Sequence, residues 1–311
     1  MDFKAFLDGL PIPILQAPMV GAASPEMAVA VSRAGALGAL GAGGLAPADM
    51  EPAVAALRAA TDRPFGVNLF INPVAAPGAD VVDAALERLA PWYAELGAAL
   101  PAAPNDYAPD FAGQFAALVR AAPPVASFTF GVLTQAQVDA LHAAGSYVVG
   151  TATTVAEARA WAAVGADGIS AQGAEAGGHR GHFLDETEAS LVGTMALVAT
   201  IRDAVEIPVI AAGGIMDGRG VVAGALQGGL ENRFMREMRA VEDHVPAYPV
   251  QNQLTQPLRA AAAQAGRADM LSLWAGQGVR LAKRGDAGEM VGEWWEEAKA
   301  ASQALSERTG R

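Results

Sequence analysis

Short apolar runs alternate with helix-like segments along the first 230 residues, and this alternation predicts an α/β fold with a parallel sheet covered by helices. The runs are almost continuously apolar, which is typical of strands buried on both faces. The alternation repeats regularly, which favours a (β/α)8 barrel over a doubly wound sheet. We therefore predict a (β/α)8, or TIM, barrel with additional C-terminal helices.

Each repeat consists of a predicted strand followed by a predicted helix. The first helix, residues 24–35, has Ser24 as its predicted N-cap, Pro25 at its first position and Gly35 to close it. A longer helical excursion is predicted over residues 79–120. The predicted strands cover residues 12–19, 37–43, 64–70, 124–130, 147–153, 167–173 and 207–214. The other predicted helices cover residues 47–60, 134–145, 154–165, 190–205 and 217–227.

Composition limits the classes of function. The chain of 311 residues carries a net charge of −12, and an acidic protein repels phosphate backbones, so we expect no nucleic-acid partner. It has no cysteine, which excludes disulfides, thiolate metal sites and cysteine nucleophiles. The N-terminus lacks the apolar core of a signal peptide, and no apolar run reaches the ~20 residues of a spanning helix. We expect a cytoplasmic protein with no membrane association.

Polar residues and glycines follow several of the predicted strands. In a barrel of this type the site lies at the carboxyl ends of the strands. The residues found at these ends are Met19, Gly21, Asn68, Gln172, Gly213 and Gly214. They are therefore candidates for a ligand site.

The segment SAQGAEAGGHRGH, residues 170–182, contains two of the four histidines, His179 and His182, beside a run of small residues. Its glycines leave the backbone bare, so the segment could lie flat against a ligand. Three interpretations stay open. The histidines could bind a metal with Glu175 or Asp185, or they could be solvated in a surface loop, or one could act on a bound ligand as acid, base or hydrogen-bond donor. We favour the third and predict no metal.

Two further glycine motifs are less specific. GAGGLA, residues 41–46, matches a dinucleotide-binding pattern, but no acidic residue ends the next strand, so we interpret it as a tight strand-to-helix turn. AAGGI, residues 211–215, lies between a strand and a helix, where paired glycines expose N–H groups that suit a phosphate. A simple tight turn is the alternative for AAGGI.

Together these segments resemble the nitronate monooxygenase family, formerly called 2-nitropropane dioxygenases, which are FMN-containing TIM-barrel enzymes. The resemblance runs almost end to end, and the histidine motif is its most specific part. It rests on QAPMVG (16–21), FGVNLF (65–70), AQGAEAGGHRG (171–181), PVIAAGGIMDGRG (208–220) and LSLWAGQGV (271–279).

The resemblance implies a role for each candidate. His179 would face the flavin and act on the substrate, while His182 has no assigned role. The residues that match flavin contacts of the family are Met19, Gly21, Asn68, Gln172, Gly177, Gly178, Gly213 and Gly214. It also implies an FMN-binding barrel over residues 1–230, followed by a helical segment over 231–311 whose C-terminal helix packs on the barrel.

The implied activity is the oxidation of alkyl nitronates, or of nitroalkanes, with O2. Two alternatives on the same fold are an NADH:quinone reductase and a flavin-type enoyl-acyl-carrier-protein reductase. A non-catalytic, flavin-free relative is an alternative of another class. The natural substrate and the oligomeric state are left open, a homodimer being one option.

An eighth strand is absent from the sequence. After residue 227 the chain runs from GALQ directly to GGLENRFMREM, where the resemblance implies a strand ending in a Gly-Thr phosphate site, a helix and a further segment. Either a few dozen residues are deleted at Gln227–Gly228, or the printed sequence omits them. We favour omission, because a deletion would leave two barrel edges unpaired.

Overall fold

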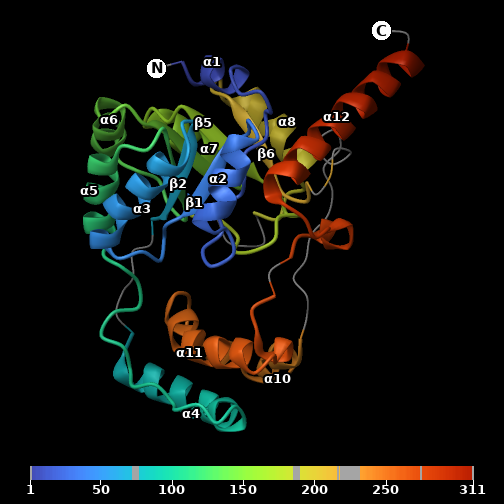
Figure 1. Ribbon diagram of the computed structural model, residues 1–311. Helices are drawn as coiled ribbons and strands as arrows, with labels where there is room; N and C mark the ends of the chain where they lie inside the picture. The colour runs from blue at the N-terminus through green and yellow to red at the C-terminus, as the bar shows by residue number, and fades with distance from the viewer. Residues whose placement is uncertain are drawn as a thin grey trace. The chain divides into compact units, whose positions relative to one another are not determined.

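A computed structural model describes residues 2–71, 77–184, 190–215, 217, 232–273 and 275–309. Its described strands form one parallel sheet in which each strand pairs with its neighbours in the sequence (Figure 1). A barrel has this sequential order, whereas a doubly wound sheet reverses its order at a switch point. The barrel-type α/β fold is thus confirmed. The strands are β1 (Gly38–Gly41), β2 (Phe65–Phe70), β3 (Val125–Thr129), β4 (Tyr147–Ala152), β5 (Gly168–Gln172) and β6 (Val209–Ala212).

The predicted first strand, residues 12–19, is wrong as a full strand. The segment makes a single parallel bridge, from Leu15 to Leu37, directly before β1. Pro13 and Pro18 have no N–H group, so the segment cannot donate a continuous ladder of hydrogen bonds. It lies beside β1 without becoming a regular strand.

The predicted helix over 217–227 and the junction at Gln227–Gly228 lie outside the described residues, apart from Asp217. The described structure therefore does not test whether the chain has an eighth strand.

The helices alternate with the strands much as predicted. α2 (Pro25–Arg33) begins at the predicted cap, where the Ser24 hydroxyl accepts a hydrogen bond from the Met27 N–H at 3.2 Å. The predicted helix 47–60 matches α3 (Pro47–Ala60), while the excursion over 79–120 divides into α4 (Ala79–Glu95) and α5 (Phe111–Ala121). The others are α1 (Phe3–Asp8), α6 (Gln135–Ala143), α7 (Val155–Ala163), α8 (Thr194–Ala204), α10 (Arg233–Met238), α11 (Val250–Gln264) and α12 (Ala287–Thr309), with short 3₁₀ helices at Arg239–His244, Ala268–Met270 and Gln277–Leu281. No described helix is long and apolar enough to cross a membrane.

The core of the barrel lies between the sheet and its covering helices. Trp161 of α7 is fully buried over Gly150 of β4, and its indole N–H donates to the Thr151 carbonyl at 3.2 Å. A Cβ atom on Gly150 would overlap the indole ring. The absence of a side chain at Gly150 is therefore what allows α7 to pack this closely.

Helix α1 covers the amino ends of the strands. Phe3 is buried in a cluster with Leu37, which precedes β1, and with Val125 and Val149 near the starts of β3 and β4. A Cβ on Gly168, the first residue of β5, would lie 2.6 Å from the Phe3 ring. The packing of Phe3 thus fills the space at the starts of β3, β4 and β5.

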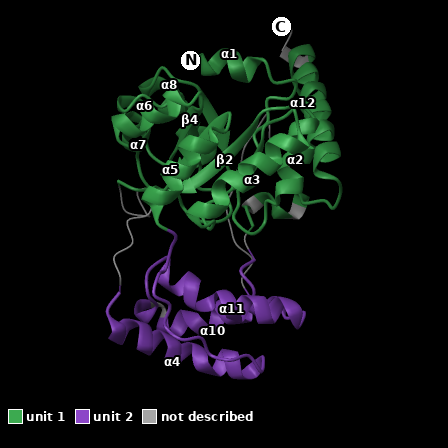
Figure 2. Cartoon of the chain, turned by 60° about the vertical axis from the view of Figure 1, so that its left-hand side comes forward, with its two compact units in different colours: residues 1–72, 110–228, 275–311 green, residues 73–109, 229–274 purple. Residues whose placement is uncertain are grey.

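The described contacts divide the chain into two compact units, which Figure 2 colours separately. Unit 1 comprises residues 1–72, 110–228 and 275–311 and contains the sheet. In this unit Val291 of α12 is buried in a cluster with Val31 of α2. The C-terminal helix thus packs against a helix of the barrel.

Unit 2 comprises residues 73–109 and 229–274 and is helical. The buried Tyr93 of α4 joins it to α11, because its hydroxyl donates to the Leu254 carbonyl at 2.7 Å and accepts from the Leu258 N–H at 3.2 Å. This grouping differs from the predicted division at residue 230. The apolar face of α4 packs on a helix more than 150 residues later, a pairing that periodicity alone does not reveal.

Gly150→Ala tests the packing of α7 on the sheet. We expect this substitution to lower the free energy of unfolding by about 1–3 kcal/mol, because the added methyl group overpacks the site under Trp161. Gly292→Ala in α12 is the matched control, since open space surrounds that position; it should stabilise by up to about 1 kcal/mol. Urea unfolding measures both. Equal effects of the two substitutions would contradict the packing argument.

Candidate active site

The predicted site residues lie at or beyond the carboxyl ends of the strands, all in unit 1. Asn68 lies in β2, Gln172 is the last residue of β5, and Gly213 directly follows β6. Parallel strands place their carboxyl ends on one edge of the sheet, so these residues share that edge. The loop with His179 begins there as well, directly after Gln172.

Two side chains hold the histidine loop at its base, and we call this pair, Gln172 and Arg180, the clasp. The Gln172 amide donates to the His179 carbonyl at 3.1 Å and accepts from the Gly181 N–H at 2.7 Å. In return, the Arg180 guanidinium donates to the carbonyls of Gln172 at 2.5 Å and Gly173 at 2.6 Å. Each side chain of the clasp thus binds the backbone beside the other. The His179 backbone is fixed between them, while its side chain is exposed.

The guanidinium of Arg180 also reaches the far side of the loop. It donates to the Ser190 carbonyl at 2.7 Å and to the Ser190 hydroxyl at 3.3 Å. Burial lowers the pKa of Arg180, and the nearby carboxylates of Glu157 and Glu175 oppose this shift. An arginine stays protonated under such a shift, so the clasp keeps its charge.

Two buried carboxylates tie the loop to the helices of the barrel. Glu175 accepts hydrogen bonds from the N–H of Thr194 at 2.7 Å and from its hydroxyl at 2.7 Å, at the start of α8. Glu157 of α7 accepts from the N–H of Phe183 at 2.5 Å and of Leu184 at 3.1 Å. The sequence pattern did not reveal Glu157, because a glutamate in the first turn of a helix is ordinary.

Metal binding was one interpretation of this segment. The described residues hold no group of three or more histidine or acidic side chains that could bind a metal ion, and Asp185 lies outside them. The carboxylate of Glu175, the other acid considered, caps α8.

The glycines of the site have different functions. A Cβ on Gly177 would lie 2.5 Å from the backbone nitrogen of Gly276, and one on Gly213 would lie 2.9 Å from that of Ala176. These two glycines allow backbone segments to approach closely. Gly178 has φ +83 with open space around its Cβ position, so it provides the left-handed turn directly before His179.

Packing also explains the glycines of GAGGLA, which spans the end of β1 and the turn into α3. A Cβ on Gly41 would lie 2.8 Å from the backbone nitrogen of Val20, and one on Gly43 would lie 2.5 Å from the Phe70 ring. The tight-turn interpretation accounts for the motif without a dinucleotide. On this side Met19 and Val20 are each 46% exposed, which leaves an apolar surface at the carboxyl edge.

Two buried polar atoms, one in β2 and one beside the start of β1, have no hydrogen-bond partner among the described residues. Asn68 is 2% exposed, and its amide nitrogen lies 3.1 Å from the Ser127 hydroxyl, but its Oδ1 is unpaired. Gln16 accepts from the Ala39 N–H at 3.2 Å, whereas its Nε2 is unpaired. An unsatisfied buried polar atom costs about 1–3 kcal/mol. A ligand with both donors and acceptors would satisfy the two atoms.

Phe130, directly after β3, is a residue of this edge that the sequence analysis missed. Its ring lies edge-on to the His179 imidazole, with centroids 5.9 Å apart and planes at 87°. Its φ of +71 is unusual for a bulky residue. The sequence pattern places Phe130 inside a predicted strand, so only the structure shows that it turns toward His179.

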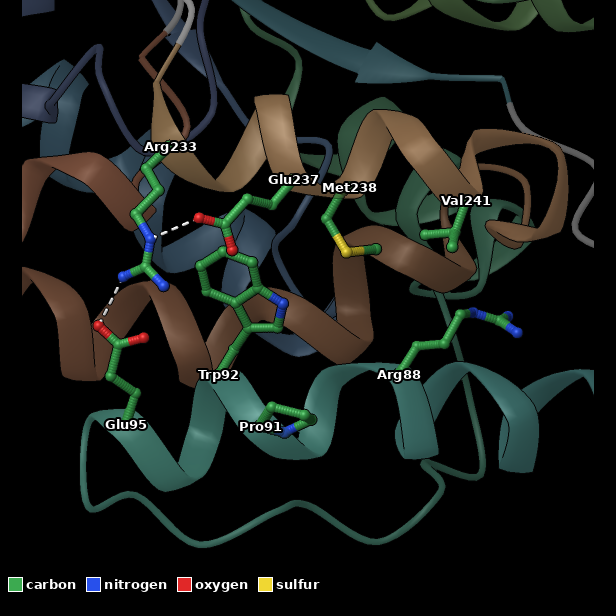
Figure 3. Close-up of a pocket in the computed structure, with 8 residues that line it drawn as sticks. All are labelled: Arg88, Pro91, Trp92, Glu95, Arg233, Glu237, Met238 and Val241. Atoms are coloured by element: carbon green, nitrogen blue, oxygen red, sulfur yellow. Dashed lines mark hydrogen bonds and ion pairs between the residues drawn. The ribbon is translucent and has the colours of Figure 1, made fainter.

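Unit 2 contains a separate pocket of about 270 Å³, shown in Figure 3. Arg233 lies over the Trp92 ring, 5.0 Å from its centroid, and pairs with Glu95 and Glu237 at 2.7 Å each. The charges of this pocket largely neutralise one another, and none of the predicted site residues line it. We therefore place the candidate active site at the carboxyl edge in unit 1.

Comparison with known proteins points in one direction. The family model described as nitronate monooxygenase matches residues 4–229 and 222–297. A probable nitronate monooxygenase of Staphylococcus aureus strain Newman is 35% identical over 317 residues, covering 87% of this chain and 89% of the relative. That of strain MSSA476 is 34% identical over 326 residues, with 90% and 92% covered.

Solved structures agree with these relatives. A nitroalkane oxidase from Streptomyces ansochromogenes is 37% identical, with a TM-score of 0.85 and coverage of 97% of this chain and 100% of that one. FabK from Thermotoga maritima has a TM-score of 0.69 at 24% identity, covering 98% of each chain, so it supports the fold alone.

The alignments also bear on the junction at Gln227–Gly228. The alignment with the strain Newman relative is 317 residues long, yet it covers 87% of a chain of 311, so that relative has residues without a counterpart here. The family model matches in two pieces that meet at residues 222–229. A missing segment at this junction predicts such a break.

Arg180→Met tests the clasp. The substitution removes the donor that binds Gln172, Gly173 and Ser190, so we expect the free energy of unfolding to fall by about 1.5–3 kcal/mol. Amide hydrogen exchange over residues 173–181 should accelerate by about tenfold or more, because local opening becomes easier. Arg202→Met, at an exposed position of α8, is the control and should change neither quantity. Unchanged exchange in Arg180→Met would show that the clasp does not hold the loop.

Proposed function

The chain belongs to the nitronate monooxygenase family, and from this premise we propose that it is an FMN-dependent enzyme that oxidises alkyl nitronates with O2. The observation that carries the proposal is His179, which the clasp fixes by its backbone while its imidazole stays exposed at the carboxyl edge of the barrel. The match over most of the chain to nitronate monooxygenases, and to a nitroalkane oxidase, supports the reaction class.

The residues of the carboxyl edge fit FMN. Asn68 Oδ1 in β2 is a buried acceptor and Gln16 Nε2, beside the start of β1, is a buried donor, each without a partner among the described residues. An isoalloxazine ring carries groups that complement both. Gly213 and Gly214, with φ +122 and +71, follow β6 where backbone N–H groups suit a phosphate. Met19, Gly21, Gly177 and Gly178 would lie along the ring, with Met19 supplying apolar contact. When bound, FMN would supply the acceptance of electrons from the anionic substrate and the reaction with O2.

Gln172 needs a more specific assignment. The nitrogen and the oxygen of its side-chain amide both bind the backbone of the histidine loop. We therefore propose that the main role of Gln172 in the FMN site is to hold this loop in place. Its contact with FMN stays a prediction.

The protein's own contribution is to hold and orient the substrate. The His179 imidazole would donate a hydrogen bond to an oxygen of the nitronate, or take the α-proton of a neutral nitroalkane. Its exposed position lets a small molecule reach it, and the fixed backbone limits where the ring can lie. The cytoplasmic location stays a prediction, and a homodimer stays one option for the oligomeric state.

The reductase alternatives have less support, because the family model, the curated relatives and the 37% identical structure are nitronate monooxygenases and a nitroalkane oxidase. We expect the purified protein to be yellow and to consume O2 with propionate-3-nitronate in the absence of NADH. The check is to measure O2 uptake with the nitronate and, separately, NADH oxidation with benzoquinone. Fast NADH oxidation without nitronate turnover would instead identify a reductase. A colourless protein that cannot be reconstituted with FMN would identify a non-catalytic relative.

His179→Asn tests the role of the histidine. We expect turnover to fall by about 10²-fold or more, because asparagine has a similar reach but cannot transfer a proton. His182→Ala is the matched control from the same loop and should keep most of the activity. The measurement is the steady-state rate of each variant, divided by its FMN content as determined by absorbance. Full activity in His179→Asn combined with a loss in His182→Ala would reverse the assignment.

A further inference from the structure

Two phenylalanines form an aromatic pair next to His179, and we call Phe70 and Phe130 the aromatic rim. Their rings lie 5.0 Å apart with planes at 62°, in an edge-to-face arrangement. Phe130 in turn lies edge-on to the His179 imidazole at 5.9 Å. The rim thus extends from the imidazole across the ends of β3 and β2.

The rim is not part of the hydrophobic core. Phe128, two residues before Phe130, is fully buried in the main cluster between sheet and helices. Phe70 and Phe130 are only half-buried and are absent from that cluster. Core packing therefore does not explain why two large apolar side chains lie at this edge.

The backbone of Phe130 is held in an unfavourable conformation. With φ +71 it occupies the left-handed region, which costs free energy for any residue with a Cβ. The neighbouring chain holds it there, because the Ile71 N–H donates to the Thr129 carbonyl at 2.8 Å and a Cβ on Gly131 would lie 2.7 Å from the Ile71 side chain. Strain of this kind is concentrated at functional sites, where the surrounding structure over-determines it. In this chain the strained turn directs the Phe130 ring to His179.

The apolar surface continues from the rim toward the start of the chain. The Phe70 ring covers the bare backbone of Gly43, and Val20 lies against Gly44, where a Cβ would be 3.3 Å from Val20 Cγ1. Met19 and Val20 are both exposed large apolar side chains. An apolar wall with an imidazole at one end matches a substrate that has an alkyl chain at one end and a polar anionic group at the other.

We infer that Phe130 sets both the orientation of the His179 imidazole and the length of alkyl chain that the enzyme accepts. The clasp binds only the backbone of His179, whereas Phe130 contacts the ring itself. With the nitronate group at His179, the alkyl chain meets the Phe130 ring first, because this ring contacts both the imidazole and Phe70, and the ring restricts the room for a longer chain beside the imidazole. Phe130 is a positioning and specificity-determining residue, and this inference rests on the proposed function.

The test compares Phe130→Ala with the wild type as FMN-loaded enzymes. The substrates are the nitronates of nitroethane, 1-nitropropane, 1-nitrobutane and 1-nitrohexane, with kcat and KM measured for each. Removing the ring should shift the ratio of kcat/KM for the longest over the shortest nitronate by about tenfold or more toward the longer chain. It should also lower kcat for every substrate, because the imidazole loses the surface that orients it.

Three further variants separate this role from a structural one. Phe130→Tyr keeps the ring and should restore the wild-type ratio. Phe130→Gly removes the ring and the strain together, so its Tm should exceed that of Phe130→Ala, and it should show the same altered ratio as Phe130→Ala. Phe111→Leu in α5 is the matched control, a partly buried phenylalanine on the helix side of the barrel, and should leave the ratio unchanged.

A second readout does not depend on turnover. The chain has four histidines, so their ring signals can be assigned by NMR with His179→Asn as the reference. Phe130→Leu should shift the His179 signals, and Phe111→Leu should not. Calorimetry of neutral nitroalkane binding then tests the chain-length effect directly.

The outcomes distinguish the inference from the proposed function. If the wild type oxidises no nitronate, the proposed function fails. The NMR signals of His179 and the calorimetry of nitroalkane binding then still test whether Phe130 orients the imidazole and limits chain length. If nitronates are oxidised but the chain-length ratio of Phe130→Ala stays within twofold of the wild type, the inference is overturned. Unshifted His179 signals in Phe130→Leu overturn it as well.

Discussion

The clasp between Gln172 and Arg180 is the interaction on which the candidate site depends. A loop rich in glycine and alanine offers few side chains with which to fix itself, so its position has to be set through its backbone. Gln172 binds the carbonyl of His179 and the N–H of Gly181, and Arg180 binds the carbonyls of Gln172 and Gly173. Gln172 is the last residue of β5, so the sheet fixes its backbone, and its side chain in turn fixes the backbone of His179.

The buried acids extend this fixation to the rest of the barrel. An isolated buried carboxylate is strongly disfavoured, but Glu157 and Glu175 each accept several hydrogen bonds from backbone N–H and threonine hydroxyl groups. Glu157 connects the turn after β4 to the end of the histidine loop, and Glu175 connects the start of that loop to α8. Arg180 lies near both carboxylates, so the charges under the loop partly compensate one another. Removing Arg180 would leave the two buried carboxylates without the positive charge that lies near both of them.

Much of the fold could be predicted from the sequence, because buried parallel strands and capped helices have strong local signals. The six strands from 37–43 onward and the helix at 47–60 were located in this way. The segment 12–19 failed because its prolines remove hydrogen-bond donors, which an apolar count ignores. The partner of α4 and the roles of Glu157 and Phe130 could not be predicted, since each depends on residues that are distant in the sequence. The implied flavin contacts of the glycines remain predictions, although packing now explains Gly177 and Gly213.

Several departures from ordinary protein packing lie at the carboxyl edge of the described sheet or in segments that lead to it. Asn68 Oδ1, which has no hydrogen-bond partner in the described part of the chain, and the exposed Met19 both belong to segments that lead to the carboxyl edge. The strained Phe130 lies directly after β3 at that edge. Ala122 also has a positive φ, but it terminates α5, where left-handed residues are common. At the amino ends, by contrast, α1 packs Phe3 into a closed apolar cluster. Natural sequences depart from local rules mainly where function requires it. These departures do not depend on any motif, and they support the placement of the candidate site at the edge that His179 occupies.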